Sequence, residues 1–385
     1  MTSSSDLFAG TYARGGAAEA VTAEAWVRAM VDVEAALAAA CVVEGLIRPQ
    51  AGEAILRALQ QGPFDAEAIA ADAGENATPV IPLVRQLRAR VGSEFADAVH
   101  VGATSQDIVD TAAMLLTQRA FAAIIADANT AMNGAARLAV AHRRTPMVGR
   151  TLLQAALPTS FGLVVAGWMV GLERATVELE RVRDSGLAVQ MGGPVGTRPP
   201  QVAARIALTM GLAEPVLPWH TERTRIAQIA AALGGISGAS AKAARDVVLL
   251  AQTEVAEVRE GVAGRGGSSA MAHKRNPVAA VSVIACAERV PGLIATLFAG
   301  MAQEHQRAAG AWQAEWGTLT ELLTLAGSAV AWLADLLAHL EVDAARMMDN
   351  VVALAASGAT AADQAEQQLA DAARLVDRAL AEVRQ

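Results

Sequence analysis

The sequence predicts an all-α protein built as a bundle of long helices. Five helix-compatible stretches support this prediction, because each is longer than about 25 residues and apolar residues recur in them at helical spacing. They cover 106–144, 158–184, 221–260, the stretch after Pro277 and 312–340. No segment alternates convincingly between apolar and polar residues, so we expect little sheet.

The composition suits a large aliphatic core. Of 385 residues, 53% are hydrophobic but only 3% are aromatic, so Ala, Val, Leu, Ile and Met must fill the interior. Alanine forms helices at low cost. The predicted helices have few wide polar faces, which indicates burial against other subunits and therefore a homo-oligomer.

Local signals mark several helix ends. Thr22 is a good N-cap and Gly45 a good stop for a helix whose apolar residues share one face over 26–41. Pro158 suits the first turn of the second long helix. Pro291 lies inside the fourth and is expected to kink that helix rather than end it.

We divide the chain into an N-terminal helical domain at 1–105, a central long-helix bundle at 106–342 and a short, reduced C-terminal segment at 343–385. Within this last segment, residues 375–383 can form one amphipathic helix. Breaks between the helices are the natural places for chemistry. These breaks are two polar turns at 100–106 and 145–154 and two glycine-rich loops at 186–200 and 261–269.

The charge balance excludes one class of partner. The net charge of −8 argues against nucleic-acid binding, which needs a basic surface, although a local pocket can still bind an anion. No uninterrupted apolar run approaches the ~20 residues of a membrane span, and the N-terminus does not resemble a signal peptide. We therefore expect a cytoplasmic protein without a membrane partner. Cys41 and Cys286 lie far apart in apolar helical runs, and we expect both to be buried free thiols.

One loop combines several features that favour proton transfer beside an anion. Residues 266–277 read GGSSAMAHKRNP. The glycines allow the loop to move and to adopt positive φ angles. Loop N–H groups can cradle an anion, and Lys274 adds a positive charge. A serine hydroxyl in such a field loses its proton more readily than in water, whereas GGSS alone is more typical of a plain linker.

The full string resembles the GSSxMxxKxNP signature of the fumarase/aspartase superfamily. Two further segments resemble that superfamily's shared regions: 100–112, which begins HVGATSQDI, and 147–158, which begins MVGRTLLQ. We call 100–112 the first region, 147–158 the second region and 266–277 the signature loop. The resemblance implies a homotetramer with a twenty-helix core, in which each active site takes these three segments from three subunits. It implies no metal and no organic cofactor.

The resemblance also implies roles for individual residues. Ser268 would exchange a proton with the carbon beside a carboxylate, while Lys274 and Asn276 would stabilise the charge that develops on that carboxylate. Thr104 and Ser105 would donate hydrogen bonds to the substrate. Further substrate contacts are expected from His100, Arg150, Thr151, Gln154, His220 and Met271. A structural role for His100 or His220, and an ion pair between subunits for Arg150, are the alternatives.

Two departures narrow the family branch. Adenylosuccinate lyase and fumarase relatives carry a His where this chain has Leu152, and a Glu where it has Val281. Both halves of that acid pair are absent together, and the segments at 218–223, 252–255 and 303–316 resemble bacterial 3-carboxy-cis,cis-muconate cycloisomerases. These enzymes of aromatic degradation act on a small polycarboxylate by forming a lactone. In the reverse direction the leaving group is a carboxylate, which needs no proton.

Two other functions stay open at this point. A lyase on the same scaffold can release an amine, ammonia or nitrite from a succinate derivative, as an adenylosuccinate-lyase-like enzyme would. A catalytically retired structural protein is the second alternative, and the intact Ser268, Lys274 and Asn276 argue against it.

Overall fold

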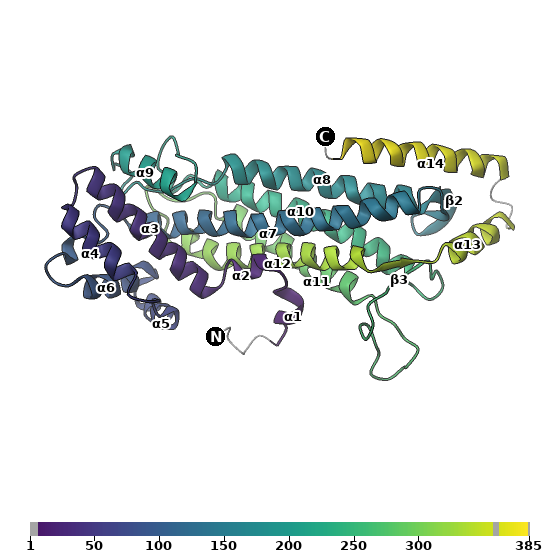
Figure 1. Cartoon of the computed structure of the whole chain (residues 1–385), viewed down its shortest axis with the longest axis horizontal. Coiled ribbons are helices and arrows are strands. Elements are labelled where there is room, and N and C mark those ends of the chain that lie inside the picture. Colours follow the sequence, from purple (N-terminus) through teal and green to yellow (C-terminus); the bar gives the residue numbers. More distant parts are fainter. Residues whose placement is uncertain (1–6, 357–361, 384–385) are drawn as a thin grey trace.

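The computed structural model describes residues 7–356 and 362–383, and it confirms the all-helical prediction. Five long helices run side by side along the longest axis of the molecule (Figure 1). They are α7 (Ser105–Ala141), α8 (Phe161–Ser185), α10 (Thr224–Leu250), α11 (Val278–Ala299) and α12 (Ala311–Ala338).

Helix α7 is the central element of this bundle. It packs against α8 on one side and α12 on the other, and most of its side chains are buried. Gly134 permits the approach to α12, because a Cβ atom there would lie 3.1 Å from Leu337 Cβ and 3.3 Å from the Leu337 carbonyl. Pro291 lies inside α11 without ending it, as predicted.

The N-terminal helices cover one end of the bundle (Figure 1). Helix α3 packs on α7, begins after the predicted N-cap Thr22 and ends at Val43, with Gly45 at φ 69°. Helix α3 covers Ala23–Val43. The other elements at this end are α4 (Pro49–Leu59), α5 (Ala66–Asn76), α6 (Val80–Val91), η1 (Ala96–Ala98) and α9 (Pro200–Met210). The short α1 (Ala9–Tyr12) and α2 (Gly16–Glu19) lie against α12.

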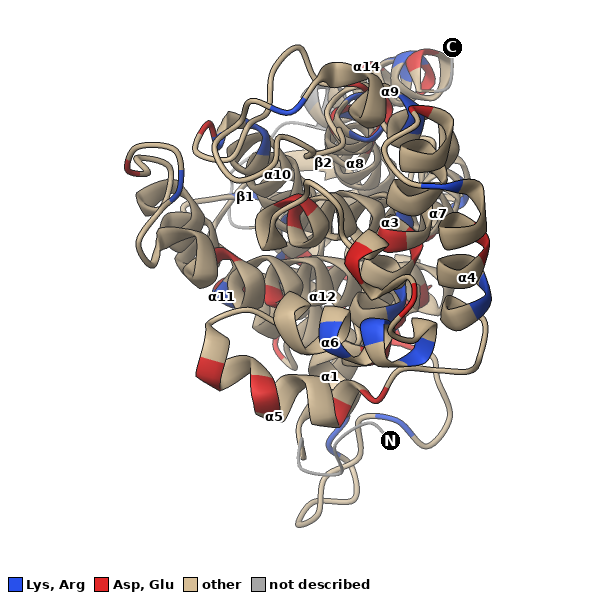
Figure 2. Cartoon of the chain, turned by 90° about the vertical axis from the view of Figure 1, so that its left-hand side faces the viewer, with Lys and Arg blue, Asp and Glu red and all other residues tan. Residues whose placement is uncertain are grey.

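Opposite charges hold two of these helices together. The charged residues of α5 are all acidic and those of α6 are all arginines, and both sets lie on the surface of this end (Figure 2). Arg85 of α6 forms an ion pair with Asp72 of α5.

The second region is a β-hairpin, and this corrects the predicted turn at 145–154. Strand β1 (Pro146–Thr151) pairs antiparallel with β2 (Gln154–Ser160), and Pro158 pairs with Val148 instead of starting a helix. Helix α8 begins at Phe161, after the N-cap Ser160. The hairpin turn consists of Leu152 and Leu153, at φ 51° and 64°. Two-residue turns with positive φ normally carry Asn and Gly. Because leucines occupy these positions, the sequence contains no signal for a hairpin turn.

The helix predicted at 221–260 ends at Leu250, which is a second correction. The chain turns there and forms β3 (Val258–Glu260), which pairs antiparallel with β4 (Leu340–Val342). The segment between β3 and α11 projects from the bundle as a long loop (Figure 1). This projecting segment contains the signature loop.

The C-terminal helices pack against the second region. Helix α13 (Ala344–Ala356) contacts β1, and α14 (Ala362–Glu382) returns along α8 and contacts β2 (Figure 1). Arg143 pairs with Asp377 of α14, and Val376 is fully buried. The amphipathic helix expected at 375–383 is therefore longer than predicted. The domain boundaries at 105 and 342 stay a prediction.

Three helices, α7, α11 and α12, are long and apolar enough to cross a membrane by length and composition. None of them is an uninterrupted apolar run, because polar residues are interspersed along each helix. The apolar windows of α7 and α12 are 78% and 72% buried in the fold, against 39% for α11. Cys41 and Cys286 are buried and free, as predicted. Residues 1–6, part of the N-terminus on which the signal-peptide prediction rests, lie outside the described residues.

Candidate active site

The first region spans the N-terminus of α7, which begins at Ser105. The backbone N–H of Thr104 donates to Asp107 Oδ2 (3.1 Å), and Arg307 Nη1 donates to Thr104 Oγ1 (2.8 Å). Burial lowers the pKa of Arg307, and Asp107 opposes this effect. Thr104 and Ser105 therefore stand beside a guanidinium and at the positive end of a long helix, where a carboxylate is favoured.

The carboxylate of Asp107 is fully buried and organises the surrounding loops. Its Oδ1 accepts from Gly192 N (2.9 Å) and Gln190 Nε2 (3.1 Å), and lies 2.8 Å from His220 Nε2. Its Oδ2 also accepts from Gly193 N (2.9 Å). His220 is only 5% exposed. The structure thus places His220, a predicted substrate-binding residue, inside a buried hydrogen-bond network. This position favours a structural role for His220. A contact between His220 and substrate stays a prediction.

One turn further along α7, Asp110 belongs to a second buried network. Arg223 Nη1 and Nη2 donate to its two oxygens (2.8 and 3.2 Å), and Arg223 Nε donates to Glu315 Oε1 (3.0 Å). Burial alone would lower the pKa of Arg223, but the two carboxylates raise it. Burial raises the pKa of Glu315, and Arg223 opposes this. The network ties α7 and α12 to the start of α10, and Asp110 contributes to it from within the first region.

His100 opens the first region in a strained conformation. Its φ is 64°, a region that residues other than glycine adopt at a cost of about 1 kcal/mol or more. Its Nδ1 lies 2.5 Å from Glu34 Oε1, and the Glu34 side chain is 2% exposed. Sequence reasoning did not identify Glu34, because this residue lies far from His100 in the chain.

The second region is held by an ion pair within the same chain. Arg150 Nη1 and Nη2 donate to the two oxygens of Glu257 (3.1 and 2.9 Å), whose side chain is fully buried. Asn350 of α13 also donates to Glu257 (2.8 Å). Thr151 and Gln154 pair across the end of the hairpin and are exposed. The side chain of Arg150 is thus engaged inside the chain, while Thr151 and Gln154 are accessible.

The signature loop places two N–H groups on its first serine. Ser268 Oγ accepts from Ala270 N (3.3 Å) and Met271 N (3.2 Å). Donors in this position stabilise negative charge on the oxygen, as a serine base requires. Lys274 is exposed, and Met271 is 44% exposed. The Asn276 amide donates to Gly266 O (3.2 Å) in this structure.

The three segments do not meet within one chain. The 37 residues of α7 separate Thr104 from the hairpin, a rise of about 55 Å at ~1.5 Å per residue. The Arg150–Glu257 ion pair joins the hairpin to the start of β3, so the signature loop leaves the bundle toward the hairpin end (Figure 1). A site that contains Thr104, Gln154 and Ser268 together requires more than one copy of the chain.

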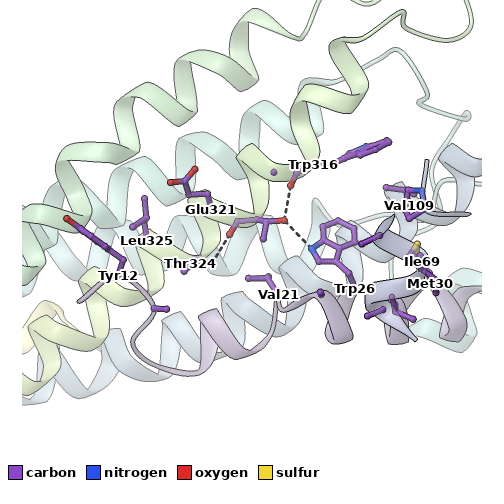
Figure 3. Close-up of a pocket in the computed structure, with 18 of the residues that line it drawn as sticks. Tyr12, Val21, Trp26, Met30, Ile69, Val109, Trp316, Glu321, Thr324 and Leu325 are labelled. Carbon is purple, nitrogen blue, oxygen red and sulfur yellow. Dashed lines mark hydrogen bonds between the residues drawn. The ribbon is translucent and has the colours of Figure 1, made fainter. Parts of the chain in front are cut away.

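Two cavities accompany these elements. A polar cavity of about 880 Å³ lies at the base of the signature loop and is lined by Gly267 and Asn276 among others. An apolar cavity of about 760 Å³ lies between the N-terminal helices and α12 (Figure 3). There Trp26 Nε1 donates to Thr320 Oγ1 (3.1 Å). None of the predicted site residues lines the apolar cavity, so it is not the candidate active site.

A bundle of long helices with a projecting loop, whose serine accepts two backbone N–H groups, is the architecture of a helical lyase. Residues 12–292 match the family described as lyase, and the chain belongs to this family, within the fumarase/aspartase superfamily.

Individual relatives agree with this assignment. The chain is 47% identical over 332 residues to a 3-carboxy-cis,cis-muconate cycloisomerase of Bradyrhizobium diazoefficiens. That alignment covers 84% of this chain and 74% of the relative. The chain is 42% identical over 353 residues to a nitrosuccinate lyase of Streptomyces davaonensis, covering 86% and 74%. The crystal structure of 3-carboxy-cis,cis-muconate lactonizing enzyme from Pseudomonas putida superposes with a TM-score of 0.85 at 37% identity, covering 98% of this chain and 89% of that one. The predicted resemblance to the superfamily and to its cycloisomerases is confirmed.

Proposed function

We propose that this enzyme is a cytoplasmic, cofactor-independent 3-carboxy-cis,cis-muconate cycloisomerase of aromatic degradation. The observation that carries the proposal is the pair of N–H groups on Ser268 Oγ, 3.3 and 3.2 Å away. They make this hydroxyl the group best prepared to exchange a proton beside a carboxylate. The cycloisomerase relatives supply the substrate class.

The reaction closes a lactone without a redox change. A carboxylate oxygen of the substrate adds to the carbon that bears the 3-carboxyl group, and a C–O bond forms. The C=C π bond breaks, and its electron pair moves to the adjacent carbon, beside another carboxylate. That carbon takes a proton from Ser268, and Ser268 regains a proton from solvent after the step. Lys274 and Asn276 hold the carboxylate that carries the developing charge. Asn276 must exchange Gly266 O for the substrate to do so.

The absence of an acid pair agrees with this chemistry. Leu152 is 96% exposed at the hairpin tip and Val281 is 51% exposed on α11, and neither side chain can donate a proton. In the reverse elimination a carboxylate leaves, and it needs no protonation. Nitrite is also a weakly basic leaving group, so elimination of nitrite from a nitro-substituted succinate is the second candidate function, favoured by the nitrosuccinate lyase relative.

We propose further that the active enzyme is a homotetramer with sites shared by three subunits. The length of α7 supports this proposal, because it holds the first region far from the other two. Helix α11 supports it too, since its apolar window is only 39% buried within the chain and Val281 and Phe298 are 51% and 45% exposed. Packing this helix against other copies would bury these residues.

A substrate comparison tests the function. The purified protein is incubated with 3-carboxy-cis,cis-muconate, and loss of diene absorbance is followed. A parallel reaction with nitrosuccinate is assayed for nitrite and fumarate. We expect turnover of the muconate; turnover of nitrosuccinate alone would establish the second candidate instead.

Two serine variants test the proton-transfer group. Ser268→Ala is expected to abolish turnover without changing the oligomeric state. Ser269→Ala is the matched control, one residue along the same loop, and should retain most activity. Retained turnover in Ser268→Ala would rule out this residue as the proton-transfer group.

A further inference from the structure

The signature loop is closed at its base by contacts between Gly266 and Asn276. We call these two residues the neck. Both the backbone N–H and the side-chain amide of Asn276 donate to Gly266 O (2.8 and 3.2 Å). Gly266 has φ 79°, and a Cβ atom there would lie 2.3 Å from Asn276 O. The neck thus separates residues 267–275, which include Ser268 and Lys274, from the rest of the chain.

The residue just before the neck is fixed to the bundle. Arg265 Nη1 forms an ion pair with Asp335 of α12, and Arg265 Nε lies 3.3 Å from Glu260 Oε2 of β3. The three side chains are 18%, 14% and 5% exposed. Ion pairs with so little solvent around them are poorly screened and hold a defined geometry.

Glu260 also binds the chain that follows the neck. Its Oε2 accepts from Ala279 N (3.1 Å) and its Oε1 from Ala280 N (3.0 Å), at the N-terminus of α11. One carboxylate therefore connects the entry of the loop, through Arg265, with its exit. Because both ends are fixed at this point, movement is left to residues 267–275.

Two nitrogen atoms of the Arg265 guanidinium have no hydrogen-bond acceptor among the described residues. These are Nε and Nη2, and both are buried; the ion-pair distance from Nε to Glu260 is short, but the alignment is poor for a hydrogen bond. The cavity at the loop base is lined by Arg265, Gly267 and Asn276.

Two neighbouring arginines, one in the loop and one on β3, have no buried ion-pair partner in the described part of the chain. Arg275 is exposed and donates only to carbonyls of its own loop, those of Ala272 and Lys274. Arg259, on the same strand as Glu260, pairs with Glu341 but its side chain is 79% exposed. Arg259 is therefore a matched control for Arg265.

We propose that Arg265 is a positioning residue, which fixes the neck so that the moving part of the loop returns Ser268 to one place. This inference rests on the proposed role of Ser268 in proton transfer. Small displacements of a reacting group lower rates strongly, because the reacting atoms must meet at a defined distance. Arg265 acts through the neck and does not touch the substrate.

Kinetics of Arg265→Met and Arg265→Lys test the proposal. Arg265→Met should lower kcat by at least about tenfold with KM changed less than about threefold, because positioning rather than substrate affinity is lost. Arg265→Lys keeps one charge and should recover part of kcat. Arg259→Met should stay within about twofold of wild type. Asp335 is not substituted, because it also binds His339 (2.9 Å) and lies 3.5 Å from Arg14.

Limited proteolysis gives a readout that does not depend on turnover. Trypsin can cleave after Lys274 and Arg275, and the cleavage rate there, measured by mass spectrometry, should rise several-fold in Arg265→Met but not in Arg259→Met. Thermal unfolding and oligomeric state serve as folding controls. Unchanged kcat and unchanged cleavage in a folded Arg265→Met would overturn the proposal. If the wild type turns over neither substrate, the proposed function fails, while the cleavage rate still tests the anchor.

Discussion

Arg150 and Glu257 form a two-point ion pair that joins the hairpin of the second region to the strand leading into the signature loop. The ion pair thereby holds the second region beside the strand from which the signature loop projects. The third predicted active-site segment, at Thr104, lies beyond the whole length of α7.

Removing one partner of this ion pair should destabilise the protein. Arg150→Met leaves Glu257 buried without its counter-charge, while the Arg150 side chain is itself 26% exposed. We expect a loss of about 2–3 kcal/mol, below the ~3–5 kcal/mol for a fully buried pair, measured by denaturant unfolding. Adding Glu257→Gln should restore part of the loss. A double variant less stable than Arg150→Met would contradict this account.

His220 should matter more for stability than for substrate affinity. His220→Gln weakens the contact with Asp107, the carboxylate that also binds Gly192 and Gly193. The expected result is a lower thermal midpoint, by several degrees for a loss of about 1–2 kcal/mol, with KM changed less than about threefold. A large rise in KM at an unchanged thermal midpoint would instead establish direct substrate contact.

The hairpin turn should tolerate, and gain from, standard turn residues. Leu152 and Leu153 have positive φ and are 96% and 71% exposed. Leu152→Asn combined with Leu153→Gly relieves the backbone strain and should stabilise the protein by about 1–2 kcal/mol. Thermal unfolding of wild type and variant provides the comparison, with Leu157→Asn, an exposed strand residue, as control. Marked destabilisation would show that the leucines are held by contacts outside the chain.

The thiol of Cys286 should be almost inert in the folded protein. Burial raises its pKa from 9.0 to about 11, although Arg289 opposes this. The folded state therefore favours the neutral thiol, and the stability it contributes is present below pH 9 and lost as pH rises toward 11. At pH 8, alkylation should be about a hundredfold slower than for an ordinary thiol, and should accelerate on unfolding. Rapid labelling of the native protein would contradict this.

The long helices were readily predicted because apolar residues recur in them with the period of a helix. The helices beginning near residues 105, 278 and 311 follow apolar spacing over many turns, and the cap at Thr22 is a local signal. The hairpin was missed because its turn residues are leucines, and the helix ending at Leu250 because no strong breaker follows it.

The site was only partly predictable, for a related reason. The signature loop is contiguous, so its residues were found together. Pairs such as Glu34 with His100 and Arg265 with Asp335 join residues 66 and 70 positions apart, and no local pattern announces them. The first region and Ser268 lie far apart within one chain because of the direction and length of α7. The sequence pattern did not predict this separation.

If active sites form where copies of the chain meet, as proposed, two inactive variants should complement each other in a mixed oligomer. Thr104→Ala keeps the backbone N–H that binds Asp107 but loses the hydroxyl, and Ser268→Ala loses the proton-transfer group. The two proteins are dissociated together, reassembled and assayed with 3-carboxy-cis,cis-muconate. Sharing predicts recovery to about one quarter of wild-type activity, the fraction of randomly mixed sites with both residues intact. Absence of recovery in verified mixed oligomers would contradict the account.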